Sequence, residues 1–327
     1  MGTTMLVSSS FVFGGKIDCY VQGMPDTIVN TFCLMHGTYT VTNTAPIRQA
    51  TEDEKNYFEK FGHRGVAHPG IGPRGARSTK LRNNVYIWIP FFFCGMSFFF
   101  FLPHLLWKMI EGGLVKSMTF KMQNPEIDDE MKRKRVDRLI KCFMANRSNN
   151  NSYATNMISI EMVQLFNVGF QFYTTHFLLG RKFVDYGIQY FIQENLTDTV
   201  FPKVSKCQFN RHGPGGDINN HDALCLLPLN ILNEKLFLLL WVWLIFLCIC
   251  SIMQLAYRVL CLCSKKFRKF MMKGTCNPKI VECFCKNASF GDYIVTCQIS
   301  KNVDREMFSE FMIKYKNVYN KEINKIV

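Results

Sequence analysis

The feature that most constrains this chain is an uncharged apolar block between Leu236 and Tyr257. Over these 22 residues the sequence contains no Asp, Glu, Lys, Arg or His. As an α-helix, the block is long enough to cross about 30 Å of hydrocarbon. A helix also satisfies its backbone polar groups internally, as a segment inside a bilayer must. The block therefore predicts a transmembrane helix, here residues 236–257, in an integral membrane protein.

Two further segments predict membrane helices. Residues 85–107 contain no Asp, Glu, Lys or Arg, and tryptophans stand near both ends, where aromatic side chains favour the membrane interface. Residues 158–180 predict a weaker span, because they include Glu161 and several polar side chains. We weighed Glu161 as part of a conduction path against a carboxylate at the cytosolic edge or in an inter-helix hydrogen bond, and favour the latter.

The charges between these spans predict the topology. Residues 108–157 hold 10 Lys and Arg against 6 Asp and Glu, and residues 258–327 hold 14 against 6. The positive-inside rule places both segments in the cytosol. Topology thus accounts for the net charge of +14, and no nucleic-acid partner is expected. The basic run at 132–135 resembles a nuclear localisation signal, but beside a membrane it predicts a cytosolic anchor.

These observations predict an all-α integral membrane protein, a transmembrane helix bundle with extracellular loops. An amphipathic helix is expected at 128–143, a flexible connection at 146–151 and a helix at 307–319. The predicted segments are an N-terminal remnant with the first extracellular loop (1–84), a transmembrane helix (85–107), a cytoplasmic loop (108–157), a transmembrane helix (158–180), the second extracellular loop (181–235), a transmembrane helix (236–257) and a cytoplasmic tail (258–327).

The cysteines divide by this topology. Of the 14 cysteines, four fall outside the cell, where disulfides persist, and the other ten fall in spans or in the reducing cytosol. The four outer residues permit three pairings, and the sequence leaves all three open. They are Cys19, Cys33, Cys207 and Cys225.

Other cysteines and one asparagine are candidate modification sites. Cys261 and Cys263 follow the last span directly, which favours palmitoylation. Asn195 begins an acceptor sequon on the outer side, which predicts glycosylation. Four tail cysteines lack the paired CxxC spacing of a zinc site, so no metal is expected there. They are Cys276, Cys283, Cys285 and Cys297.

Catalytic patterns find little support in the sequence. The seven histidines form no HExxH motif, and the glycines at 70 and 75 lack the Lys-Ser/Thr that completes a phosphate-binding loop. No nucleophile, base and orienting group assemble into a recognisable set. We therefore expect no enzyme, no catalytic residue, no cofactor and no metal.

Several motifs resemble the innexins, the invertebrate gap-junction proteins. FPKVxKCxF from Phe201, the following GPGG and LCLLPLNILNEKLF at 224–237 resemble their second extracellular loop and last transmembrane helix. Residues 17–41 are similar to their first extracellular loop, with Cys19 and Cys33 at the family's cysteine positions and a shorter spacing between them. The segment at 86–91 is similar to the family signature YYQWVPF, through Tyr86, Trp88, Pro90 and Phe91.

The resemblance implies a channel subunit in the plasma membrane, multi-pass and located at gap junctions. Such subunits form a ring with the same or other innexins, contact membrane lipid and dock to an opposed ring on the neighbouring cell. They pass ions and small molecules between cells or act as hemichannels. The resemblance also implies that disulfides brace the two extracellular loops within one subunit.

The beginning of the chain departs from the family pattern. In innexins a cytosolic N-terminal helix and a pore-lining first span precede the first extracellular loop, and this sequence does not contain them. We expect an incomplete start or an upstream exon, with a viral copy as another possible origin. The alternative function is a non-conducting regulatory or dominant-negative subunit.

Overall fold

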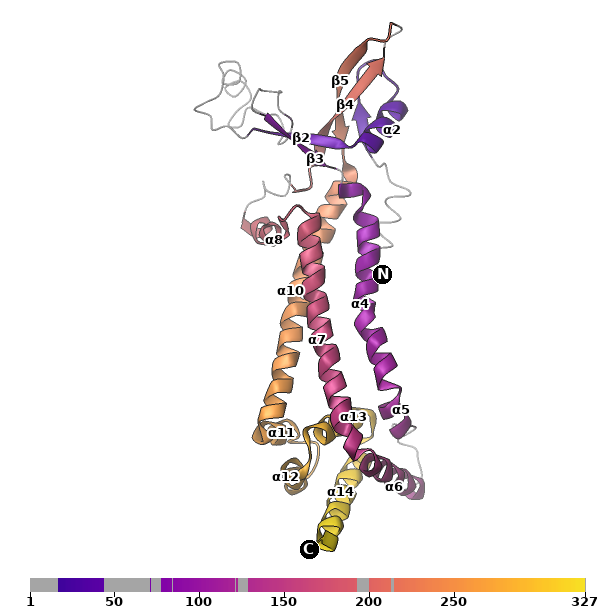
Figure 1. The fold of residues 1–327 in the computed structure, drawn as a ribbon, viewed down its shortest axis with the longest axis vertical. Coiled ribbons are helices and arrows are strands. Elements are labelled where there is room, and N and C mark those ends of the chain that lie inside the picture. The colour runs from indigo at the N-terminus through magenta and orange to yellow at the C-terminus, as the bar shows by residue number, and fades with distance from the viewer. Residues whose placement is uncertain are drawn as a thin grey trace. The chain divides into compact units, whose positions relative to one another are not determined.

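The described part of the chain divides into two compact units. The computed structural model describes residues 17–43, 71, 78–83, 85–120, 122, 129–192, 200–212 and 215–326. Unit 1 comprises residues 1–99 and 169–246, and unit 2 comprises residues 100–168 and 247–327. Three long helices contribute residues to both units (Figure 1): α4 (Ile89–Glu111), α7 (Arg147–Leu178) and α10 (Pro228–Cys263).

Unit 1 contains a five-stranded antiparallel sheet in the order β1-β5-β4-β2-β3. The predicted all-α class was therefore incomplete, although the chain is mostly helical. The strands are short or weakly apolar, so their sequences do not show the alternation that predicts a strand. In addition, β2 pairs with β4 across more than 160 residues, which no local pattern can predict. The strands are β1 (Asp18–Tyr20), β2 (Thr38–Asn43), β3 (Ser78–Asn83), β4 (Val204–His212) and β5 (Ile218–Leu226).

Helix α2 (Asp26–His36) packs against this sheet. Pro25 is its N-cap residue, and Asp26 lies in its first turn, where a negative charge suits the helix dipole. Gly37 ends the helix with φ +81°, a conformation that favours glycine. Its inner face buries Val29, and the ring of Phe32 meets that of Phe209 on β4 at 4.9 Å.

The remaining helical elements of unit 1 join around aromatic side chains. They are η2 (Val85–Ile87), α8 (Phe183–Ile192) and the unit's parts of the three long helices. Phe237 on α10 is fully buried and meets Phe93 on α4 and Phe201 before β4, each at 5.3 Å between ring centroids. Phe99 and Phe170 link α4 to α7 at 5.4 Å.

Unit 2 is a helical domain with one apolar core. Its α6 confirms the predicted amphipathic helix, and its α14 extends the predicted helix at 307–319. Phe143 of α6 packs edge-on against Phe311 and Tyr315 of α14, at 5.5 and 5.9 Å. The unit's own helices are α5 (Leu114–Met118), α6 (Asp129–Ala145), α11 (Lys265–Met271), α12 (Pro278–Asn287), α13 (Phe290–Asn302) and α14 (Arg305–Ile326).

The predicted flexible connection at 146–151 is wrong, because α7 begins at Arg147. Two tertiary hydrogen bonds hold this first turn against the start of α13. Asn150 Nδ2 donates to Asp292 Oδ1 at 2.8 Å, and the Gly291 N–H donates to Asn151 Oδ1 at 3.0 Å. Asparagine side chains that favour loops in isolation are here satisfied by another helix.

We expect Gly291→Ala to destabilise unit 2. A Cβ at this position would clash with the backbone of Asn150 and Asn151, which cannot rotate away as a flexible side chain can. The overpacking should cost about 1–3 kcal/mol of unfolding free energy. Thermal unfolding of the purified protein measures the loss. Gly169→Ala, whose Cβ would meet nothing within 4 Å, is the matched control and should unfold like the wild type.

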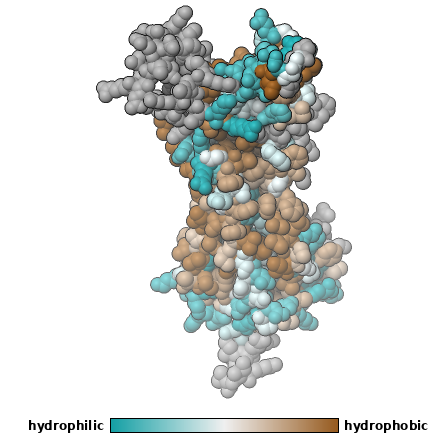
Figure 2. Space-filling view, turned by 45° about the horizontal axis from the view of Figure 1, so that its top comes forward, coloured by the Kyte–Doolittle hydropathy of each residue, from teal (hydrophilic) through white to brown (hydrophobic). Residues whose placement is uncertain are grey.

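Two of the described helices, α4 and α10, are long and apolar enough to cross a membrane. Only 22% and 17% of their most apolar windows are buried, whereas the core helix of a soluble protein is mostly buried. Large apolar side chains such as Phe98 and Leu239 therefore remain exposed, and Figure 2 shows brown, apolar surface over the long helices. Helix α7 is 32 residues long but too polar to qualify, so its predicted span stays a prediction.

Candidate functional site

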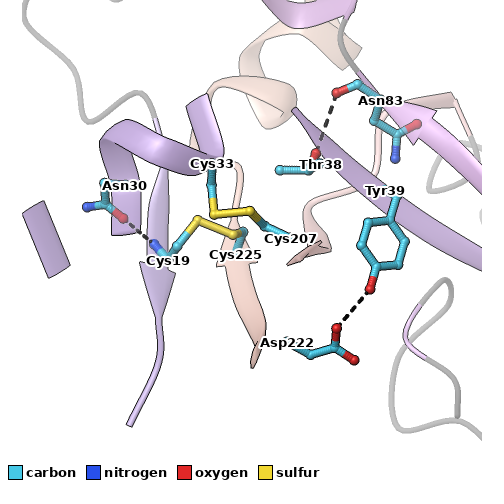
Figure 3. The surroundings of a disulfide bond; sticks show 9 residues. All are labelled: Cys19, Asn30, Cys33, Thr38, Tyr39, Asn83, Cys207, Asp222 and Cys225. Carbon is cyan, nitrogen blue, oxygen red and sulfur yellow. Dashed lines mark hydrogen bonds between the residues drawn. A yellow bond between two sulfur atoms is a disulfide. The ribbon is translucent and has the colours of Figure 1, made fainter. Parts of the chain in front are cut away.

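Two buried disulfides form the centre of unit 1 (Figure 3). Cys19 is bonded to Cys225, and Cys33 is bonded to Cys207. Cys19 is 3% exposed and the other three are fully buried. Two of the three pairings that the sequence left open join the first predicted loop to the second, and of these two the structure has the one that bonds Cys19 to Cys225 and Cys33 to Cys207.

The strand register explains this pairing. Cys19 on β1 lies directly opposite Cys225 on β5. Cys207 on β4 pairs with Ala223, two residues before Cys225, so both hairpin cysteines point to the same face of the sheet. Helix α2 lies on that face and presents Cys33 to it. The bonds thus tie segments 206 and 174 residues apart in the chain.

Hydrogen bonds complete the frame around the disulfides. The Cys19 N–H donates to Asn30 Oδ1 of α2 at 2.6 Å. Tyr39 on β2 donates its hydroxyl to Asp222 Oδ1 on β5 at 3.1 Å (Figure 3). Thr38 Oγ1 donates to the carbonyl oxygen of Asn83 at 3.4 Å, which adds a side-chain contact to the pairing of β2 with β3. These contacts hold both loops as one body.

The β4–β5 hairpin is anchored to the start of α10. Asn230 Nδ2 donates to the carbonyl oxygen of Pro202 at 2.8 Å, and the Leu227 N–H donates to that of Lys203 at 2.8 Å. Tyr186 of α8 donates its hydroxyl to the carbonyl oxygen of Glu234 at 2.6 Å. Helix α10 therefore supports the hairpin through paired backbone and side-chain contacts.

The carboxylate of Glu234 is buried at this anchor, with 5% of its side chain exposed. It forms ion pairs with Lys203 at 3.4 Å and with Lys235 at 3.2 Å. A buried charge requires such partners, because removing it from water costs several kcal/mol. The pair with Lys203 links α10 to the segment before β4.

The far end of the hairpin is exposed and polar. The last residues of β4 and the first of β5 present amides and charges to the surroundings, and their partners on the sheet hold them in register. A rigid, polar projection of this kind suits recognition of another protein surface by hydrogen bonds. Its exposed residues include Asn210, Arg211, Asp217, Asn219 and Asn220.

Residues of the sequence signature near the start of α4 have different surroundings. Tyr86 is buried, whereas Trp88 and Phe91 are 63% and 66% exposed and their rings lie 6.1 Å apart. Pro90 is half-buried. These rings are placed to meet lipid or another chain rather than the core of unit 1.

The described residues show one cluster of three potential metal-ligand side chains, Cys19, Cys33 and Cys225, but disulfides occupy all three sulfurs. The tail cysteines do not form such a cluster. Burial raises the pKa of Cys297 to about 11, and that of Cys285 is raised for the same reason. These thiols therefore stay protonated at neutral pH, whereas a metal binds the thiolate.

Glu161 takes part in an inter-helix ion pair within unit 2. Its carboxylate accepts three hydrogen bonds from the guanidinium of Arg258 on α10, at 2.8 to 3.1 Å, and one from Gln254 Nε2 at 3.1 Å. The geometry matches the structural interpretation of Glu161 that the sequence favoured.

The two candidate palmitoylation cysteines differ in accessibility. Cys261 is fully buried, and its thiol lies 3.7 Å from the Tyr293 hydroxyl, whereas Cys263 is exposed. Acylation needs an accessible sulfur, so the proposal narrows to Cys263. The candidate glycosylation site Asn195 lies outside the described residues.

We expect Cys263→Ser to remove any palmitate from the chain, while Cys261→Ser leaves it in place. Acyl-exchange labelling of the two variants measures this difference. Equal labelling of wild type and Cys263→Ser would contradict the assignment of the acceptor, because the buried Cys261 would then carry the lipid.

The sequence did not single out several residues that hold this site. Asn30, Tyr39 and Asp222 are ordinary polar residues in the sequence, and only the fold brings them to the disulfides. Asn230 and Glu234, by contrast, lie within the LCLLPLNILNEKLF motif. A polar residue in the apolar segment just before a predicted membrane helix could have indicated a buried contact, because a buried polar group requires a hydrogen-bonding partner.

Comparison with known proteins points to one family. The sequence profile of the Innexin family matches residues 1–319. Innexin inx2 of Drosophila melanogaster is 31% identical over 319 residues, which cover 94% of this chain and 83% of that protein. Innexin inx2 of Schistocerca americana is 29% identical over 321 residues, covering 94% and 86%. Innexin shaking-B of Drosophila melanogaster is 26% identical over 323 residues, covering 95% and 83%.

Proposed function

The chain belongs to the innexin family of gap-junction proteins, and on this premise we propose that it is a channel subunit of the plasma membrane. In this role it passes ions and small molecules between adjacent cells, or across one membrane as a hemichannel. The observation that carries the proposal is the pair of disulfides that joins both outer loops into one body. Channel proteins of this kind are not enzymes.

Docking of two channels across a gap requires outer loops with a fixed shape. A loop that reorders on contact loses conformational entropy, which weakens association. In unit 1 that entropy is already lost, because two disulfides and the β2–β4 pairing restrict the hairpin. The exposed polar end of the hairpin then offers hydrogen-bonding groups to an opposed subunit.

We propose that α7 crosses the membrane with α4 and α10. Support comes from its one acidic residue within the predicted span, Glu161, whose carboxylate is paired with another helix rather than left in lipid. Glu161 binds Arg258, and Gln254 donates to the same carboxylate. Polar groups inside a membrane are tolerated where neighbouring helices satisfy them. In this topology segments 1–84 and 181–235 lie outside the cell, and segments 108–157 and 258–327 lie inside.

The partners in this proposal are further subunits. The exposed rings of Trp88 and Phe91, and the exposed apolar faces of α4 and α10, suit contact with neighbouring subunits and with lipid. The ring would contain copies of this chain or other innexins, and would dock to an opposed ring on the adjacent cell.

Paired-cell recording tests the proposal. Cells without endogenous junctions are paired after both express the chain, and we expect junctional current and dye transfer. Pairs in which one cell lacks the chain are the control and should show neither. Surface expression without any current, alone or with another innexin, would contradict the channel role and favour the non-conducting alternative.

A tag tests the orientation independently of conduction. An epitope inserted between Gly215 and Gly216 should bind antibody on intact cells, whereas one after Lys314 should require permeabilisation. Labelling in the opposite order would invert the topology and remove the docking surface from the outside of the cell.

A further inference from the structure

A cavity of about 490 Å³ lies within unit 2, apart from the disulfide centre in unit 1. Four helices line it: the end of α4, α5, the start of α7 and the end of α13. The side chains on which the argument depends are Trp107, Glu111, Lys116, Tyr153, Gln298 and Asn302.

Aromatic rings form one wall of the cavity. Trp107 and Tyr153 meet edge to face, with centroids 5.6 Å apart and planes at 74°. Phe120 adds a third ring and is 65% exposed. Ring faces attract organic cations, tryptophan most strongly, and such groups of rings recognise quaternary ammonium ligands.

A carboxylate stands beside these rings. Glu111 is the last residue of α4, where the negative end of the helix dipole adds to its own charge. Within the described part of the chain it has no ion-pair partner, and its Oε1 accepts one long hydrogen bond, from the Val115 N–H at 3.4 Å. Burial raises the pKa of Tyr153 to about 12, and the negative charge of Glu111 adds to this rise. The Tyr153 phenol therefore stays neutral in the cell.

Helix α13 offers acceptors to the cavity. Asn302 Nδ2 donates to the carbonyl oxygen of Gln298 at 2.9 Å, and Gln298 Nε2 donates to Met157 Sδ at 3.7 Å. Because the amide nitrogens of both side chains already donate hydrogen bonds, their amide oxygens can accept one from a bound ligand. Lys116 is exposed at the cavity and forms no ion pair with any described residue.

We propose that this cavity binds an organic ammonium group that carries a phosphate, the chemistry of a zwitterionic phospholipid headgroup. The ammonium lies against Trp107 and Tyr153 and opposite the Glu111 carboxylate, and the phosphate pairs with Lys116. A lipid is the favoured source, because the cavity lies at the end of α4, a helix apolar enough to span the membrane. The proposal does not depend on whether the channel conducts.

Titration of the purified full-length protein in a maltoside detergent tests the binding site. The probes are dihexanoylphosphocholine, choline, and 3,3-dimethylbutanol, which has the shape of choline without its charge. Tryptophan fluorescence is the readout, and Trp107→Phe assigns the signal to this cavity. We expect saturable binding of dihexanoylphosphocholine and of choline, and at least tenfold weaker binding of the neutral alcohol.

Variants separate the two charged contacts. Glu111→Gln should weaken the binding of both ammonium ligands by about tenfold. Lys116→Gln should weaken the binding of dihexanoylphosphocholine alone. Glu130→Gln, on the exposed face of α6, is the matched control and should bind like the wild type. Lys116 is exposed, so Lys116→Gln is expected to fold normally. It therefore still tests the proposal if Glu111→Gln fails to fold.

The outcomes of these titrations support or overturn the proposal. Much tighter binding of dihexanoylphosphocholine than of choline supports the phosphate-bearing headgroup, and equal binding of the two would overturn the phosphate contact with Lys116. Binding of the neutral alcohol as tight as that of choline would overturn the proposal. So would a saturable signal that persists unchanged in both Trp107→Phe and Glu111→Gln.

Discussion

Replacing Cys33 and Cys207 together by serine is expected to abolish coupling between paired cells. The double change removes one disulfide without leaving a reactive thiol, and the bond from Cys19 to Cys225 remains. Helix α2 then loses its covalent attachment to β4, although its contact with Phe209 persists. The hairpin should lose the fixed shape that docking requires.

The size of this effect follows from the loop that the bond closes. Both disulfides join the same two segments, so with one bond in place the second closes a loop of only about 32 residues. The chain-entropy estimate for such a loop is about 4 kcal/mol, a large part of the typical stability of a folded domain. Because a loss of this size approaches the stability of a small domain, we expect the hairpin to open.

Dye transfer between paired cells, normalised to surface biotinylation, measures the coupling. Cys263→Ser, which removes an exposed thiol from unit 2, is the control and should couple normally. The docking interpretation fails if the double variant reaches the surface and couples within about twofold of the wild type, since a loss of about 4 kcal/mol predicts far more than that.

Arg258→Ala is expected to destabilise unit 2 strongly. The side chains of Arg258 and Glu161 are only 8% and 14% exposed, and four hydrogen bonds, one from Gln254, converge on the carboxylate. Removing the cation leaves a buried charge with a single amide donor. Breaking such a pair costs about 3–5 kcal/mol.

Thermal unfolding in lipid nanodiscs measures this loss. The double variant Glu161→Gln with Arg258→Gln removes both charges and should recover part of the stability, because no unpaired charge remains. Lys134→Ala breaks an exposed pair with Glu130 on α6 and should cost less than about 1 kcal/mol. Equal effects of Arg258→Ala and Lys134→Ala would show that the buried pair is not a structural requirement.

Local patterns in the sequence predicted a substantial part of the architecture. The apolar blocks of α4 and α10 and the amphipathic face of α6 depend on residue type and spacing alone, so composition and periodicity reveal them. The helical spacing would also assign Met131 to that face, yet Met131 is 49% exposed, so the pattern alone does not fix where the face ends. The spans and the positive-inside rule also predict an outer position for four cysteines, and this position stays a prediction.

What the tertiary structure alone decided concerns partners that lie far apart in the chain. It selected one of three disulfide pairings through the register of β1 with β5 and the packing of α2 on β4, and it placed a sheet in the two segments that were predicted as loops. It also extended α7 back to Arg147 through Asp292 and Gly291, and it buried Cys261 while leaving Cys263 exposed. A sequence pattern reports what one segment prefers, whereas each of these outcomes depends on which segment lies opposite it. That contact forms only when the whole chain has folded.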